Sequence, residues 1–294
     1  RNREIKWKAL MARFRPGEVR RSRRVRKLLR HGIPESIRGR VWLYLADVEA
    51  SYRRPGVFEA LLSPNREPLP IYEAIERDIH RCYPNHVHFL REDGPGQGDL
   101  HRVLRAYARY NPAVGYCQGM GRLVGMMLMY MPAEDAFWLL VATIDTHLTG
   151  YYTPTLARLK VDCTVLARLI DLHLPPLGAH LKANDVEPLM YATQWFLTLF
   201  TMSLPWSTVL LTWDHFYLSG TKVLFRIALG ILQSHRTFLL RQCPSSTELL
   251  HHLLHLPQDD PSLQPRALLD TAYRIPIRRS EIEKLTRRVY REEA

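Results

Sequence analysis

Apolar side chains recur along most of this 294-residue chain at intervals of three and four positions, the spacing that places them on one face of an α-helix. Leu100, Val103, Leu104 and Tyr107 are one example. No segment alternates apolar and polar residues over a length that would support a β-strand. Helices are expected over residues 19–31, 71–82, 99–110, 116–131, 133–147, 155–173, 188–203, 206–218, 221–240, 245–255 and 278–292.

Glycine and proline residues separate these predicted helices. Gly32 follows the helix over 19–31 as a C-cap, and Pro34 opens the next helix. The junction prolines further on are Pro84, Pro112, Pro132, Pro154, Pro175, Pro176, Pro188, Pro205 and Pro244. Residues 91–98 and 256–266 are expected to be loops. The pattern predicts an all-α, multi-helix domain with two lobes and no significant sheet.

Composition narrows the class of protein. Hydrophobic residues make up 46% of the chain, which is ordinary for a globular protein with a large core. The four cysteines stand far apart without a C-x-x-C pair, as expected for thiols in a reducing cytosol. The longest apolar stretch, residues 123–131, is about half of the roughly 20 residues that a membrane span needs. We expect a cytoplasmic protein, with peripheral association at endomembranes left open, and a fragment of something longer because no methionine begins it.

Positive charge is concentrated at the N-terminus. The formal net charge is +12, and residues 1–30 alone hold 13 Lys and Arg against 2 Asp and Glu. We therefore separate a basic helical leader, residues 1–27, from a main domain, residues 28–294. Residues 1–30 are either a solvated helical surface or a contact for an anionic membrane or an acidic partner. Nucleic-acid binding is not expected, because it favours cations spread over a folded face with aromatic residues among them.

Three short motifs follow one another along the chain, and each is weak by itself. They are R-x-x-x-W at residues 38–42, I-x-x-D-x-x-R at residues 75–81 and Y-x-Q at residues 116–118. Their defining residues are Arg38, Trp42, Ile75, Asp78, Arg81, Tyr116 and Gln118. The second motif ends in an arginine and the third in a glutamine. Arginine and glutamine are the two residue types that accelerate GTP hydrolysis in GTPase systems, the first by neutralising charge and the second by orienting water.

Arg81 and Gln118 also have ordinary structural interpretations. On a helix, Asp78 and Arg81 share one face, so the carboxylate can hold the arginine in place. The arginine can equally complement the dipole at a helix C-terminus. Gln118 is expected just inside a helix, where its amide can orient a water molecule or satisfy nearby backbone groups. Spacing alone does not decide between these interpretations.

The remaining motif residues are interpreted as architectural. Arg38 and Trp42 lie one helical turn apart, where a guanidinium can stack near an indole. They are expected to brace the face that carries Arg81. Ile75 is a core position, and Tyr116 is expected to be buried with its hydroxyl hydrogen-bonded.

Taken in order, and with the flanking segments 32–34 and 111–115, the motifs resemble the TBC domain of Rab GTPase-activating proteins. The resemblance covers residues 28–240, and more loosely the rest of the chain. It implies a TBC fold in which Arg81 is the catalytic arginine and Gln118 is the glutamine finger that replaces the GTPase's own glutamine. The supporting residues would be Asp78, Arg38, Trp42, Tyr116 and Ile75.

The resemblance further implies a role in vesicle trafficking without a cofactor of the chain's own. GTP and Mg²⁺ would be carried by a Rab-type small GTPase in its GTP-bound state. The chain would complete that partner's active site and catalyse nothing alone. The alternative is a catalytically silent TBC module that only binds a GTPase or another protein. Both finger positions are filled here, which favours the active form.

Some positions depart from the family pattern or point to other chemistry. Gly121 stands where the family usually has asparagine, and the family often has arginine and glutamate at the positions of Thr212 and Ser219. The glycines at 115, 119, 121 and 125 predict close packing between helices. His251 and His255 are spaced like a metalloprotease pair, but the required glutamate is missing. Neither a P-loop G-x-x-x-x-G-K-[ST] nor a G-x-S-x-G elbow occurs.

Overall fold

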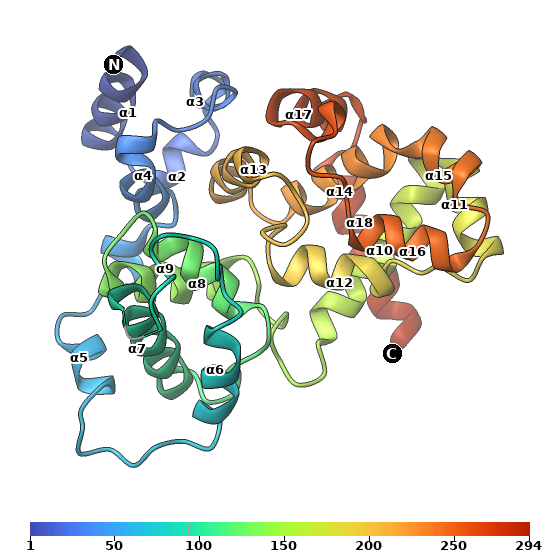
Figure 1. Ribbon diagram of the computed structural model, residues 1–294. Coiled ribbons are helices and arrows are strands. Elements are labelled where there is room, and N and C mark those ends of the chain that lie inside the picture. Colours follow the sequence, from blue (N-terminus) through green and yellow to red (C-terminus); the bar gives the residue numbers. More distant parts are fainter. Residues whose placement is uncertain (93) are drawn as a thin grey trace. The chain divides into compact units, whose positions relative to one another are not determined.

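The computed structural model describes residues 1–92 and 94–294, which form two compact units, residues 1–155 and 156–294 (Figure 1). Both units are helical, and the described residues contain no β-strand. The all-α prediction is therefore confirmed. Asp93, part of the predicted loop over 91–98, lies outside the described residues.

The first unit has its core around three helices that pack against one another (Figure 1). In chain order, its α-helices are α1 (Asn2–Arg13), α2 (Pro16–Val19), α3 (Arg23–Leu29), α4 (Arg38–Leu45), α5 (Val57–Leu61), α6 (Tyr72–Ile79), α7 (Pro95–Tyr110), α8 (Met120–Leu128) and α9 (Ala133–Thr146). The core helices α7, α8 and α9 bury Leu104, Val124 and Trp138 among them. Helix α6 packs on both α7 and α8, which fixes the segment that follows it.

Helix α7 begins earlier than the sequence pattern predicts. Residues 95–98 form its first turn instead of a loop, with Pro95 at the first helical position, where its missing N–H costs nothing. Gln97 is buried and donates a hydrogen bond of 3.0 Å to the main-chain oxygen of Phe89. Glycines at 94, 96 and 98 suggest a loop, but this tertiary contact outweighs their low helix propensity.

The second unit is also built from helices that follow one another closely. They are α10 (Ala157–His173), α11 (Pro175–Ala183), α12 (Leu189–Leu197), α13 (Trp206–Ser219), α14 (Lys222–Ser234), α15 (Arg236–Gln242), α16 (Ser246–Leu254), α17 (Pro265–Arg274) and α18 (Arg279–Glu293). Helix α14 packs on α13 and α17. The buried Arg226 of α14 donates hydrogen bonds to the carbonyls of Ala272, Ile275 and Ile277, and so neutralises the C-terminal end of α17.

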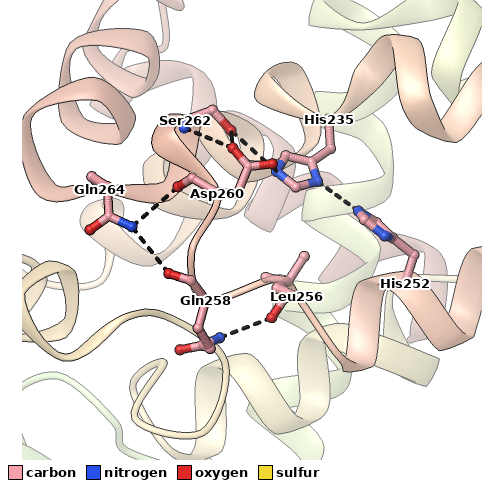
Figure 2. A network of polar contacts seen from close by, with 7 residues as sticks. All are labelled: His235, His252, Leu256, Gln258, Asp260, Ser262 and Gln264. Carbon is pink, nitrogen blue, oxygen red and sulfur yellow. Dashed lines mark hydrogen bonds and ion pairs between the residues drawn. The ribbon is translucent and has the colours of Figure 1, made fainter.

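Figure 2 shows a polar network between His235, which joins α14 to α15, helix α16 and the segment after α16. Nδ1 of His235 and Nε2 of His252 are 2.6 Å apart, and Nε2 of His235 lies 3.4 Å from a carboxylate oxygen of Asp260. The hydroxyl of Ser262 lies within hydrogen-bond distance of both His235 and Asp260. The network ties the loop over 256–264 to two helices. That loop is shorter than predicted, because α17 already begins at Pro265.

Several other helix bounds differ from the prediction for local reasons. The helix expected over 221–240 is divided at His235 into α14 and α15. The helix expected over 188–203 ends at Leu197, because Leu199 and Phe200 adopt left-handed backbone angles. The pattern also missed the short helices α2, α5 and α11, and the longer α17.

Across the described residues, no single helix meets the length and hydropathy of a membrane span, although α14 and α15, bent by 53°, do so as a pair.

Candidate functional site

Arg81 lies in the first unit, two residues beyond the end of α6. Ile75 and Ile79 bury the inner face of this helix, so Ile75 is a core residue as predicted. The backbone N–H of Arg81 bonds to the carbonyl of Asp78 at 3.0 Å, closing a turn that ends the helix. The predicted helix over 71–82 therefore extends three residues past the end of α6. The Arg81 side chain is 64% exposed and projects from a loop instead of a helix.

Gln118 lies in a turn immediately before α8 and is exposed. Gly119 follows it with φ of 107°, a backbone conformation that a helix cannot include, so α8 begins only at Met120. The prediction that Gln118 sits just inside a helix over 116–131 is therefore wrong. The residue is held by the turn in which the N–H of Met120 bonds to the carbonyl of Cys117 at 3.1 Å.

The carboxylate of Asp78 joins these two loops. Asp78 is buried; its Oδ1 accepts a hydrogen bond from Nη2 of Arg81, and its Oδ2 accepts one of 2.6 Å from the hydroxyl of Tyr116. The charged hydrogen bond to Asp78 raises the pKa of Arg81. Burial, and then the bond to Asp78, raise the pKa of the Tyr116 phenol, so its hydroxyl stays protonated and donates. One carboxylate therefore connects the loop of Arg81 with the loop that leads to Gln118.

The chain after Arg81 packs onto the glycines of α8. A Cβ at Gly121 would lie 2.6 Å from Sγ of Cys82, and one at Gly125 would lie 2.7 Å from the ring of Tyr83. Larger residues at these positions would push the Arg81 loop away. The sequence pattern predicts close packing between helices, but the partner here is a loop. The proximity of Cys82 also gives a physical reason for the glycine at position 121.

Arg38 and Trp42 lie on α4, and both contact the ring of Tyr130. The guanidinium carbon of Arg38 is 5.6 Å from the centroid of the Tyr130 ring, and Trp42 packs edge-on against the same ring at 5.3 Å. Arg38 is buried and bonds to Glu35 at 2.6 Å and to the carbonyl of Ile33 at 2.8 Å. Tyr130 follows the C-terminal end of α8, so the two residues hold the far end of the helix that begins after Gln118.

Sequence reasoning missed three residues of this arrangement: Tyr83, Arg122 and Tyr130. The hydroxyl of Tyr83 donates to the carbonyl of Arg122 at 2.7 Å, and the Arg122 guanidinium lies over the Tyr83 ring. An aromatic residue between Arg81 and Pro84, opposite a helix with two glycines, was the available signal. Among the described residues, no three His, Cys, Asp or Glu side chains gather as a metal site would require.

The all-helical fold and this ordered set of motifs define a TBC-type domain. The model of the RabGAP-TBC family, described as the Rab-GTPase-TBC domain, matches residues 35–240. The chain therefore belongs to this family.

Individual relatives agree with this assignment. Mouse TBC1 domain family member 10B is 36% identical over 287 residues, which are 97% of this chain and 36% of that protein. Human growth hormone-regulated TBC protein 1 is 37% identical over 81% of this chain and 70% of its own length. The crystal structure of the Chlamydomonas flagellar RabGAP TBC domain matches with a TM-score of 0.75 and 31% identity, over 85% of this chain and 84% of that one. The chain thus spans about a third of the length of the first relative.

Proposed function

We propose that this chain accelerates GTP hydrolysis by a GTP-bound Rab-type GTPase, with Arg81 as an arginine finger and Gln118 as a glutamine finger. The observation that carries the proposal is the link through Asp78, which joins the loops of two exposed side chains of complementary chemistry. These two are exposed, as groups that act on a partner must be.

Arg81 would act by its charge. Its guanidinium would enter the partner's nucleotide site and stabilise the charge that spreads over the transferring phosphoryl group. An arginine supplied in this way is worth roughly 10³–10⁵ in rate, which corresponds to about 4–7 kcal/mol of barrier. Before docking, the bond to Asp78 restricts the otherwise exposed side chain. This pre-organisation lowers the entropy that ordering would cost in the complex.

Gln118 would act by geometry. A neutral carboxamide both donates and accepts hydrogen bonds, so it can orient an attacking water without adding charge beside the phosphates. GTP and Mg²⁺ belong to the partner in this mechanism. The chain itself would supply only the two side chains and the surface that docks them.

A hydrolysis screen tests the proposal. Phosphate release from a panel of GTP-loaded Rab proteins is measured with the wild-type chain, Arg81→Ala and Arg81→Lys. At least one Rab should be stimulated, and both variants should lose most of that stimulation, since lysine lacks the planar fork. Arg77→Ala is the matched control, because Arg77 is an exposed arginine on α6, four residues before Arg81. Undiminished stimulation by both Arg81 variants would refute the role of Arg81, and a chain that binds a Rab without stimulating it would be a scaffold.

A separate observation supports contact with an anionic membrane. Arg21, Arg23, Arg24, Arg26, Lys27 and Arg30 are all exposed, and none of them forms an ion pair within the described part of the chain. Val25 and Leu29 bury the inner face of α3. Ile5 and Phe14, which are 60% and 47% exposed, add apolar groups to the leader. Exposed cations together with apolar side chains suit a lipid headgroup region better than an acidic protein or a nucleic acid.

Vesicle sedimentation tests this contact. The chain should sediment with phosphatidylcholine vesicles only when they contain phosphatidylserine, and salt should weaken the binding. Arg23→Gln with Arg24→Gln removes two cations worth about 1 kcal/mol each, a roughly thirtyfold loss. Arg287→Gln with Arg288→Gln on α18, where both residues are exposed, is the matched control. Equal binding by both double variants, or no dependence on phosphatidylserine, would exclude the leader as a membrane contact.

A further inference from the structure

The backbone adopts a left-handed conformation two residues after Arg81. Tyr83 has a φ of 53°, in the left-handed region that a bulky residue occupies only when its surroundings enforce it. Its side chain is buried, stacks with Phe89 at a centroid distance of 6.0 Å and lies over Gly125 of α8. The conformation of this residue therefore determines the direction in which the preceding two residues, and with them Arg81, leave the surface of α8.

A single residue of α8 holds Tyr83 in two ways. The main-chain oxygen of Arg122 accepts the 2.7 Å hydrogen bond from the tyrosine hydroxyl. The guanidinium carbon of the same residue lies 4.0 Å from the centroid of the tyrosine ring, close enough for a cation–π contact. Arg122 is in the first turn of α8, four residues after Gln118. The contact thus joins the loop of one proposed finger to the helix that follows the other.

We infer that Tyr83 and Arg122 form a latch that positions Arg81 relative to Gln118. The inference rests on the proposed function and adds two positioning residues to it. Neither residue needs to touch the nucleotide. The latch acts by holding the Arg81 loop at a fixed distance from the start of α8, so that both fingers reach one phosphate site together.

The latch complements the link through Asp78. Asp78 holds the Arg81 guanidinium itself and the tyrosine of the Y-x-Q motif. Tyr83 and Arg122 hold the main chain on the other side of Arg81. The bond to Asp78 restricts the side chain of Arg81, but its direction also depends on a fixed backbone. The latch supplies this fixation, which a buried carboxylate alone does not.

Paired tyrosine variants test the latch. Tyr83→Phe removes the hydroxyl that bonds to the Arg122 carbonyl. Tyr44→Phe is the matched control, because its hydroxyl donates an equally long bond of 2.7 Å to the carbonyl of Phe14 in the same unit. At a saturating concentration of the chain, Tyr83→Phe should reduce the hydrolysis rate about fivefold, the worth of one ordinary hydrogen bond. The concentration that gives half-maximal stimulation should change less than twofold, and Tyr44→Phe should change neither.

A second background distinguishes positioning from direct catalysis. If the latch acts through Arg81, then Tyr83→Phe and Arg122→Gln cause no further loss in a chain that already carries Arg81→Ala. A further loss with Arg122→Gln would mean that Arg122 itself contacts the nucleotide, which would overturn the inference. Arg122→Lys keeps the charge but loses the planar stack, so it should resemble Arg122→Gln in the wild-type background.

Hydrogen exchange gives a readout that needs no GTPase. In the free chain, the amides of residues 82–90 should exchange faster in Tyr83→Phe than in wild type or Tyr44→Phe, because the latch holds that segment. Unchanged exchange in Tyr83→Phe would overturn the inference whatever the activity. If the wild-type chain stimulates no Rab, the proposed function fails by that result alone, and the exchange measurement still decides whether the latch holds the loop.

Discussion

The hydroxyl of Tyr116 and the carboxylate of Asp78 form a hydrogen bond of 2.6 Å that connects two segments 38 residues apart. The tyrosine belongs to the Y-x-Q motif and the aspartate to the motif that ends in Arg81. Because Asp78 also binds Arg81, the tyrosine and the arginine share one acceptor. Two motifs that are separate in sequence therefore act as one structural element.

Removal of the Tyr116 hydroxyl should weaken this element without dismantling the fold. In Tyr116→Phe, Oδ2 of the buried Asp78 loses its partner, which should lower the free energy of unfolding by about 1–3 kcal/mol. Stimulation of the partner should fall by less than in Arg81→Ala, because the guanidinium is still present. Urea unfolding and phosphate release measure the two effects. A variant with wild-type stability would show that the hydrogen bond contributes nothing to the unit.

Gln118→Ala should lose most of the stimulation while its stability stays close to that of wild type. The side chain is exposed, so its truncation removes a group that acts on the partner and little that supports the fold. Gln242→Ala is the control, since Gln242 is an exposed amide at the end of α15. Phosphate release with a responsive Rab measures the effect. If Gln118→Ala stimulates like wild type, the GTPase uses its own glutamine.

Removal of the Cys82 sulfur should compensate in part for the destabilising effect of a larger residue at position 121. A methyl group at position 121 would lie 2.6 Å from Sγ of Cys82, so Gly121→Ala should destabilise the chain by about 1–3 kcal/mol. Combination with Cys82→Ala removes the sulfur and should recover part of that loss. Urea unfolding of the two single variants and the double variant gives the interaction energy. Strictly additive losses would mean that the sulfur is not the group in conflict with the added methyl.

The sequence predicts local contacts in this site well and distant ones poorly. The three-residue spacing of Asp78 and Arg81 predicts that the carboxylate holds the arginine, and the structure shows that contact. The sequence also predicts that the hydroxyl of Tyr116 is hydrogen-bonded. It does not identify the partner, because that partner depends on how α6 packs on α8. The loop positions of both proposed fingers were missed, because the turn after Ile79 and the left-handed Gly119 interrupt an apolar pattern that continues past them.

The helices that depend on local pattern could likewise be predicted from the sequence, and those that depend on tertiary packing could not. Most helices follow from the spacing of apolar residues. The break between α14 and α15 at His235 does not, because the apolar spacing continues across it. Helices α5 and α11 are short, and α17 begins inside a segment that contains four prolines within residues 257–276. Composition at these positions favours loops, whereas burial of Phe58, Leu177 and Leu268 favours helices. Tertiary packing prevails in each case.

The histidine network of Figure 2 should make the stability of the chain depend on pH. Burial, and then the neighbouring His235, lower the pKa of His252 to about 4, and burial lowers the pKa of His235 as well. Only one proton can lie between two nitrogens 2.6 Å apart, so protonation of both rings would place two N–H groups against each other. Asp260 opposes this effect only in part.

The sign of the dependence follows from the order in which the two states bind protons. An unfolded histidine takes up its proton as the pH falls below about 6.5, whereas His252 in the folded chain does so only near pH 4. The stabilisation is therefore complete above pH 6.5 and decreases as the pH falls towards 4. The shift in the pKa of His252 alone would correspond to about 3 kcal/mol in the free energy of unfolding. Partial exposure of the ring reduces this contribution to about 1–2 kcal/mol.

Urea unfolding of wild type and His252→Gln between pH 7 and pH 4 measures this contribution. Glutamine keeps a hydrogen-bonding group beside His235 but does not titrate, so the variant should lose about 1–2 kcal/mol less than wild type over this interval. Burial also lowers the pKa values of His147 and His215 to about 4, so both chains share that part of the loss. The difference between the two chains therefore isolates His252. Parallel curves would show that His252 does not contribute to the acid sensitivity of the chain.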